Sequence, residues 1–327
     1  MQFLERFKGK SILNISHADL DGIMSTVIGL YYIKPIAFKY DTHNSDQYDC
    51  SDYDIKRFKE YDIVLFTDFS PEENVVNYMN ENNIDYLIFD HHISRKENLE
   101  NLSGEKYIFD NSKCGCKIFF DSITKGIRVK KVIYQAVEFC NVYDLYQMQS
   151  SLWREAKGLS NVLWGMTSWF SNLQSTAKYQ KFIDAMLYKF NFEKAFYLNK
   201  YEVEIMEKAE QKERDNYEVA KKNMIIRTDN SGNKYAYFEC SSKISIVSNW
   251  ILQEKSELKY IVCHSTFDDK NGNIKPKVSI RSLEDRGVDC ASIASIWTGG
   301  GHRCSSGVEF KDFKDFEKLR KGKMHLI

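Results

Sequence analysis

The chain has 327 residues, and 46 Lys and Arg balance 46 Asp and Glu, so its formal net charge is +0. Hydrophobic residues make up 43% and charged residues 28%, with only 3 Pro and 16 Gly, which excludes collagen-like, low-complexity and disordered chains. At roughly 150 residues per domain, this length predicts a globular protein of two domains, and the neutral charge provides no overall attraction for a long polyanion.

The beginning of the chain contains no uninterrupted apolar segment followed by a small-residue cleavage site, and no apolar run approaches the ~20 residues that span a bilayer. We therefore expect a cytoplasmic protein with no membrane partner. Eight cysteines are scattered without a C-x-x-C pair, which favours reduced thiols. We interpret the closest pair, Cys114 and Cys116, as small residues at a helix start, because a closed zinc site needs four ligands.

Short apolar runs alternate with helical stretches in the first part of the chain. The runs that are apolar enough to be buried on both faces, as parallel strands are, lie at residues 11–15, 36–40, 62–67, 85–90 and 106–110. This order predicts an α/β fold with a doubly wound, mostly parallel sheet. After the third run, Ser70, Pro71 and Glu73 predict a helix that Ser70 caps.

The remainder of the chain is expected to be helical first and mixed afterwards. Residues 112–200 carry aromatic and aliphatic side chains at helical spacing, and the highly charged residues 201–223 predict a solvated helix. The strands expected beyond it lie at 235–240, 260–265 and 275–282, and the helices near 243–255 and 312–322. The predicted domains are therefore 1–200 with its helical extension, a linker helix at 201–224, and a smaller mixed α/β domain at 225–327.

Carboxylates and imidazoles gather where the predicted strands end. The first strand runs into His17, Asp19 and Asp21, the third into Asp68, and the fourth into the sequence Asp-His-His at 90–92. The carboxyl ends of parallel strands meet at one edge of a sheet, where ligands of such folds bind. We therefore expect these side chains to lie close together.

The chemistry of these clusters favours divalent cations. Carboxylates at close range repel one another unless cations compensate their charge. Aspartates combined with imidazoles suit Mn²⁺ or Mg²⁺ better than a thiolate-bound zinc. A single aspartate after a strand is usually a helix cap, and a single histidine usually a satisfied core or surface group. Three clusters at three strand ends, however, predict a site for two metal ions.

These residues carry a resemblance to a known family. Residues 17–22 (HADLDG), 67–70 (TDFS) and 90–92 (DHH) resemble the first three motifs of the DHH phosphoesterase superfamily, which is named for the third. Near the other end, residues 278–282 (VSIRS) and the sequence GGGH ending at His302 resemble the DHHA1 substrate domain. The likeness is to members of the nanoRNase and single-strand exonuclease type.

The resemblance implies two divalent ions, Mn²⁺ first and Mg²⁺ as the alternative. It places His17, Asp19 and Asp68 around one ion, and Asp21, Asp68 and His91 around the other, so that Asp68 bridges both. The reaction it implies is hydrolysis of a phosphoester or phosphodiester by a water molecule that the ions activate.

Further roles follow from the same resemblance. Asp144 is the candidate for a fourth metal-binding motif, Asp90 would orient ligands, and His92 would face the substrate phosphate. We expect Asp68, Asp90 and His92 to be the residues most directly involved in catalysis. The glycine run fits a turn whose N–H groups approach an anion closely. The expected substrate-binding residues are Arg281, Gly299, Gly300, Gly301, His302 and Arg303.

Several substrates remain open. The neutral charge and the lack of an additional nucleic-acid-binding module favour short oligonucleotides or dinucleotides. A single-strand-specific exonuclease on longer DNA or RNA and a phosphoadenosine-phosphate phosphatase are the alternatives. An inorganic pyrophosphatase and a catalytically silent nucleotide-binding protein rank below them. A homodimer is a further open expectation.

Overall fold

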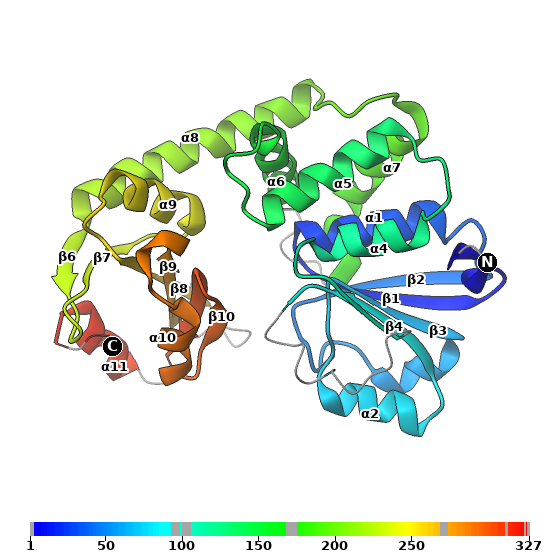
Figure 1. Ribbon diagram of the computed structural model, residues 1–327, viewed down its shortest axis with the longest axis horizontal. Helices are drawn as coiled ribbons and strands as arrows, with labels where there is room; N and C mark the ends of the chain where they lie inside the picture. The colour runs from blue at the N-terminus through cyan, green and yellow to red at the C-terminus, as the bar shows by residue number, and fades with distance from the viewer. Residues whose placement is uncertain are drawn as a thin grey trace. The chain divides into compact units, whose positions relative to one another are not determined.

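The computed structural model describes residues 3–92, 99, 106–167, 175–268, 274–310, 313–323 and 325. The chain divides into two compact units, Met1–Glu207 and Lys208–Ile327, each built on one β-sheet (Figure 1). The domain boundaries inferred from the sequence stay a prediction. Within the described ranges, every helix is too short or too polar to cross a membrane.

The first unit contains a five-stranded sheet in the order β2-β1-β3-β4-β5, and every adjacent pair is parallel. This confirms the predicted α/β class with a parallel sheet. The strands are β1 (Ser11–His17), β2 (Lys39–Ser45), β3 (Ile63–Thr67), β4 (Asp85–Asp90) and β5 (Tyr107–Phe109).

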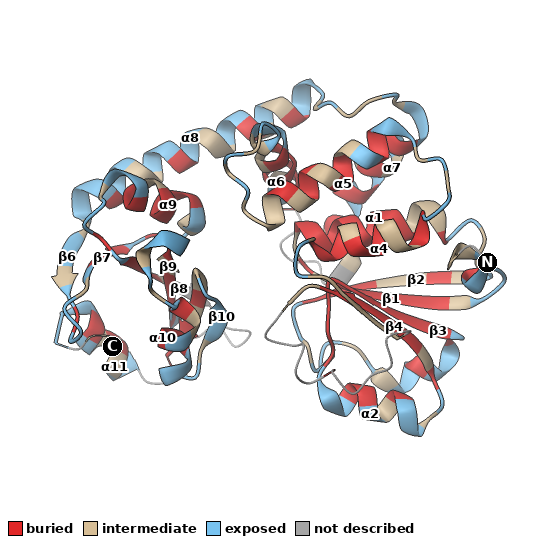
Figure 2. Cartoon of the chain, in the orientation of Figure 1, coloured by how far each residue is buried: buried red, intermediate tan, exposed pale blue. Residues whose placement is uncertain are grey.

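Helices cover both faces of this sheet (Figure 2). Alternate strand residues such as Leu65 and Phe89 pack with α1 and the later helices, whereas Val64 and Ile88 pack with η2 and α2. Among the described residues, the helices of this unit are η1 (Phe3–Phe7), α1 (Leu20–Tyr32), η2 (Ile55–Glu60), α2 (Glu73–Glu81), α4 (Gly115–Ile123), α5 (Lys131–Asp144), α6 (Trp153–Thr167), η5 (Ser175–Tyr179) and α7 (Gln180–Phe192).

Two local predictions in this unit were wrong. The second strand begins at Lys39 rather than at residue 36, and Phe38 before it is exposed. Strand β2 is polar because it lies at the edge of the sheet. The helix after β3 begins at Glu73, not at Pro71, and Glu72 is its N-terminal cap. Ser70 does not cap it, because its hydroxyl donates a hydrogen bond to the buried Asp90 carboxylate.

The long helix α8 (Lys200–Asn223) lies where the sequence predicts a charged linker helix. Its start is less solvated than expected, because Glu202 is completely buried and its carboxylate lies 2.8 Å from Lys189 Nζ. Glu202 also accepts a hydrogen bond from the Asn199 N–H, while the Asn199 side chain accepts one from the Glu202 N–H. This reciprocal capping box begins the helix, so the charge pattern alone misjudged the burial.

The second unit has a mixed six-stranded sheet in the order β10-β11-β9-β8-β7-β6. Its elements are β6 (Ile225–Thr228), β7 (Lys234–Glu239), α9 (Ile244–Glu254), β8 (Tyr260–Asp268), β9 (Ile274–Ser282), η6 (Glu284–Arg286), α10 (Cys290–Ile296), β10 (Gly300–His302), β11 (Ser305–Glu309) and α11 (Phe313–Arg320). The sequence did not predict β6, β10 or β11. The expected glycine turn is instead mostly the edge strand β10, which pairs with β11.

Candidate metal centre

The predicted site residues meet at the carboxyl edge of the parallel sheet. Ser16 is in register with Thr67, and Thr67 with Phe89, so the residues that follow on β1, β3 and β4 lie beside one another. A hydrogen bond between the buried Ser16 and Thr67 hydroxyls joins the strand ends directly. The sheet topology therefore brings together the three sequence clusters.

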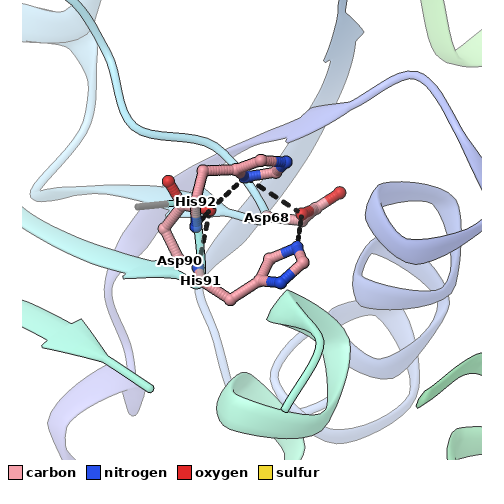
Figure 3. Close-up of side chains that lie close together, drawn as sticks. All are labelled: Asp68, Asp90, His91 and His92. Carbon is pink, nitrogen blue, oxygen red and sulfur yellow. Dashed lines mark hydrogen bonds and ion pairs between the residues drawn. The ribbon is translucent and has the colours of Figure 1, made fainter. Parts of the chain in front are cut away.

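Asp68 lies at the middle of this group. Its carboxylate is buried and lies 3.7 Å from His17 Nδ1, 3.4 Å from His91 Nε2 and 3.9 Å from His92 Nδ1. Figure 3 shows Asp68 facing the two adjacent histidines of β4's end. Its backbone has a φ of 53°, in the left-handed region, which is a strained conformation of the kind found at functional sites. Asp68 is therefore positioned to serve two ligand groups at once.

The two ligand groups around Asp68 are distinct. In one, His17 Nδ1 lies 3.1 Å from Asp19 Oδ2 as well as facing Asp68. In the other, His91 Nε2 lies 3.4 Å from Asp144 Oδ2 and 3.8 Å from Asp21 Oδ2. Within each triad the candidate ligand atoms lie within 4.8 Å of one another. The first triad is His17, Asp19 and Asp68, and the second is Asp21, His91 and Asp144. Asp144, at the end of α5, lies in the second group.

Asp90 and His92 form a pair beside these groups. Asp90 Oδ1 lies 2.7 Å from His92 Nδ1 and accepts the His91 N–H at 2.8 Å (Figure 3). The Ser70 hydroxyl donates a hydrogen bond to the other oxygen of Asp90. Burial raises the pKa of Asp90, but the His92 hydrogen bond and charge outweigh it, so the pKa is lowered overall. Asp90 therefore fixes the orientation of the two histidines.

Glycines allow the helix ends to approach the ligands. A Cβ on Gly115 would lie 2.6 Å from Asp68 Cα, and one on Gly22 would lie 2.0 Å from the His17 carbonyl oxygen. Since Cβ atoms are not found at such distances, α4 and α1 begin this close to the site only because glycine is present there. The N–H groups of Gly115 and Cys116 both donate to Asp21, at 2.6 and 2.7 Å. Asp19 in turn caps α1 by accepting the Gly22 N–H at 3.1 Å.

The crowded carboxylates show the electrostatic effects of burial and of like charges. Burial and the Asp68 charge raise the pKa of Asp21 to about 8, and burial and the Asp21 charge raise that of Asp144 to about 7. Burial lowers the pKa of His91, but its contacts with Asp68 and Asp144 outweigh this effect and raise it to about 10. Burial, followed by the Asp19 charge, also raises the pKa of Asp68. Without cations, the site therefore relieves repulsion by holding protons.

Several polar atoms of the site have no hydrogen-bond partner among the described residues, although they are buried. They are His17 Nδ1, Asp68 Oδ1, Asp68 Oδ2, His91 Nε2 and Asp144 Oδ2. Leaving such atoms unsatisfied costs about 1–3 kcal/mol each, and all five belong to residues of the two triads. Oxygen and imidazole ligands that face one another and lack other partners fit hard or borderline divalent cations.

The sequence did not reveal the residues that contact His17 on the side away from Asp19 and Asp68. His17 Nε2 lies 3.4 Å from Asp46 Oδ1, and the Tyr48 ring stacks on the imidazole with centroids 5.9 Å apart. The Asn44 side chain and the Tyr179 hydroxyl donate to the carbonyls of His17 and Ala18, at 3.3 and 3.1 Å. Because the second strand was predicted to end at residue 40, nothing in the pattern placed the segment after β2 at this site.

The predicted substrate-binding residues all belong to the second unit. Arg281 on β9 is in register with Ser305 on β11, which is in register with His302 on β10. Arg281 Nη1 donates to the Ser306 carbonyl at 3.1 Å, so part of its guanidinium holds the sheet together. Four consecutive residues in the β10–β11 hairpin are exposed to solvent, namely Gly300, Gly301, His302 and Arg303. This structure thus places Arg281 and His302 near one end of the sheet, beside the predicted glycines.

Comparison with known protein families finds a match within the first unit. Residues 11–140 match the family model described as DHH family, N-terminal domain. None of the curated proteins compared with this sequence matches it significantly.

Solved structures share the fold at low sequence identity. A pGpG-specific phosphodiesterase, PggH, from Vibrio cholerae matches with a TM-score of 0.56 at 13% identity, over 96% of this chain and 97% of that one. RecJ from Thermus thermophilus in complex with Mn²⁺ matches with a TM-score of 0.60 at 14% identity, over 97% of this chain but 52% of RecJ. The DHH domain of a protein described as a member of a family of ribosomal proteins matches with a TM-score of 0.66 at 12% identity, over 98% of this chain and 87% of that one. At these identities the matches show the fold alone.

Removal of divalent cations should destabilise the first unit. Mn²⁺ at about 100 times its dissociation constant should add about 2.7 kcal/mol, which raises the melting temperature by roughly 5 °C or more, and EDTA should reverse the gain. The comparison variant is Asp68→Asn, in which Mn²⁺ should raise the melting temperature only slightly. Equal melting curves with Mn²⁺ and with EDTA would contradict a metal centre.

The stabilisation of the first unit by Mn²⁺ should also depend on pH. The raised pKa values of Asp21 and Asp144 mean that the metal-free folded state binds protons that the unfolded state releases. The raised pKa of His91 acts in the same direction, so stability falls as pH rises from about 6 to about 8. Mn²⁺ replaces these protons, so its stabilising effect should be larger near pH 8 than near pH 6. A larger effect at the lower pH would be inconsistent with this assignment.

Proposed function

Because residues 11–140 place the first unit of this chain in the DHH family, we propose that the protein is a metal-dependent phosphodiesterase of short oligonucleotides or dinucleotides. The observation that carries the proposal is a pair of ligand triads. Asp68 belongs to one triad and faces His91 of the other at 3.4 Å, and buried ligand atoms in both triads lack hydrogen-bond partners among the described residues. The similar fold of PggH, which is described as acting on the dinucleotide pGpG, supports a short substrate.

The residues of the first unit have separable roles in this proposal. His17, Asp19 and Asp68 would hold one divalent ion, and Asp21, His91 and Asp144 would hold the second together with Asp68. Two such ions lower the pKa of water and neutralise charge that develops on a phosphoryl oxygen. Mn²⁺ is the proposed metal, since the site mixes imidazole with carboxylate ligands.

Asp90 and His92 act beside the ions. Asp90 accepts from the His92 ring and from the backbone that carries both histidines, so it aims His92 at the substrate. The raised pKa of His92, about 9, results from burial being outweighed by its hydrogen bond and attraction to Asp90. In the metal-free site His92 is therefore protonated near neutral pH. In this proposal its ring donates a hydrogen bond to the substrate phosphate.

The second unit supplies contacts that select the substrate in this proposal. Arg281 and His302 offer charge-assisted or neutral donors, and the glycines before His302 leave the backbone of β10 exposed. A nucleotide-sized ligand would use these groups, whereas pyrophosphate would not need them. This difference favours a phosphodiesterase over an inorganic pyrophosphatase.

A single-strand exonuclease is the second candidate. The similarity to RecJ favours it, although the chain spans only about half of RecJ's length. Mn²⁺-dependent hydrolysis of a dinucleotide, a cyclic dinucleotide, phosphoadenosine phosphate, pyrophosphate and an end-labelled oligonucleotide separates the candidates. We expect the dinucleotide to be cleaved fastest, and preference for the long oligonucleotide would favour the exonuclease.

Asp68→Ala should lower the rate of hydrolysis by about 10³-fold or more, because both ions lose a ligand at once. Asp110→Ala is the matched control, since Asp110 also follows a strand of this sheet but its carboxylate contacts Ser112 and Lys113. The control should retain activity. Asp68→Ala turnover within tenfold of the wild type, at saturating Mn²⁺, would exclude the two-ion assignment.

His302→Ala should lower kcat/KM for a dinucleotide by about 10-fold to 10³-fold while leaving Mn²⁺ affinity unchanged, because it removes a substrate donor and no metal ligand. Arg281→Ala should behave similarly, with thermal melting to monitor its structural hydrogen bond to Ser306. Lys277→Ala, an exposed change on the same strand, is the control. If neither variant changes kcat/KM, the second unit does not bind the substrate through these residues.

A further inference from the structure

A second group of ligand-type side chains adjoins the metal centre. Ligand atoms of Asp21, Cys114 and Cys140 lie within 4.8 Å of one another, and Cys140 Sγ is 3.6 Å from Asp21 Oδ1. Neither cysteine is exposed to solvent, and Asp21 is 1% exposed. Cys114 precedes α4 and Cys140 belongs to α5, so residues distant in the sequence converge here.

Cys116 brings a third thiol to the same place. It lies in the first turn of α4, is completely buried, and its N–H donates to Asp21 Oδ1 at 2.7 Å. The Cys140 thiol contacts the thiols of both Cys114 and Cys116. Three thiols and one carboxylate therefore gather in a region that solvent does not reach.

This set differs in chemistry from the neighbouring triads. Thiolates are soft ligands that bind Zn²⁺ and Cd²⁺, whereas Mn²⁺ and Mg²⁺ prefer oxygen and imidazole. Structural zinc sites use four ligands, commonly three or four of them sulfur. The sequence offered only the C-G-C pair, which is too few ligands. The fold adds Cys140 and Asp21, so three ligand atoms, from Asp21, Cys114 and Cys140, lie within 4.8 Å of one another, with the buried Cys116 as a neighbour.

Packing alone explains part of this arrangement. Buried cysteines often serve as small apolar side chains, and each of these three fills space between α1, α4 and α5. Packing does not require that two of these thiols lie within 4.8 Å of a buried carboxylate, to which Cys140 Sγ donates a weak hydrogen bond at 3.6 Å. A cation would compensate the charge of Asp21 together with that of any thiolate it binds.

We propose that Asp21, Cys114 and Cys140, with Cys116 as a further thiol beside them, form a binding site for a thiophilic divalent cation, Zn²⁺ or Cd²⁺, next to the metal centre. The two sites share Asp21, whose Oδ2 faces His91 at 3.8 Å. A carboxylate has enough lone pairs to keep both backbone hydrogen bonds and bind a cation. Each thiol that binds releases its proton. Occupation of the thiol site draws Asp21 away from His91, so it weakens Mn²⁺ binding and inhibits the enzyme.

The inhibition rests on the proposed function, but the existence of the site does not. The test is a titration of the metal-free, reduced full-length protein with Cd²⁺, followed by sulfur-to-cadmium charge-transfer absorption. We expect the wild type to show this absorption, saturating near about one equivalent of tight binding. Cys114→Ala and Cys140→Ser should each lower the absorption by about half or more, because each removes a thiolate ligand.

Cys240→Ala is the matched control. Cys240 is buried in the second unit beside Cys263, so this substitution also removes a thiol that has a thiol neighbour. It should leave the absorption from tightly bound Cd²⁺ unchanged. A variant that no longer melts cooperatively is replaced by its counterpart, Cys114→Ser or Cys140→Ala. Absence of the band in the wild type, or its full retention in both site variants, would overturn the proposal. The titration uses no substrate, so its result does not depend on whether the protein hydrolyses phosphodiesters.

Discussion

Repulsion among buried carboxylates at the carboxyl edge of the parallel sheet is the constraint on which the first unit depends. Asp21 and Asp68 are almost completely buried, and Asp19 and Asp144 lie beside them. Burial of so much like charge is unfavourable unless cations or protons compensate it. The surrounding structure holds the carboxylates together nonetheless, through helix starts at Gly22 and Gly115 and the left-handed backbone of Asp68. This is the arrangement expected of a fold whose stability and chemistry both rely on bound cations.

Most of this site could be predicted from the sequence, because it follows from topology. Apolar runs identified β1, β3 and β4, and parallel strands bring the residues that follow them to one edge. Asp144 needed the family resemblance, since it ends a helix rather than a strand. The support of His17 by Asp46 and Tyr48 could not be predicted. The edge strand β2 is polar, so its extent was misplaced by hydrophobicity.

Other features depend on contacts between distant segments, which no local pattern encodes. The Cys140 thiol reaches Asp21 only because α5 packs beside α4, and Glu202 is buried only because Lys189 on α7 faces it. In the second unit, the glycines before His302 were interpreted as a turn because glycine favours turns. They form an edge strand instead, where their pairing with β11 requires the close approach of two backbones. Burial of charge and pairing of edge strands are tertiary properties.

The central claim is that the two triads bind two cations that share Asp68. Isothermal titration of the metal-free protein with Mn²⁺, together with the electron paramagnetic resonance spectrum of the bound ions, tests this directly. The account predicts two bound Mn²⁺ per chain, magnetically coupled through a shared ligand, and loss of the coupling and of tight binding in Asp68→Asn. A single uncoupled Mn²⁺ in the wild type, or two tightly bound ions in Asp68→Asn, would contradict it.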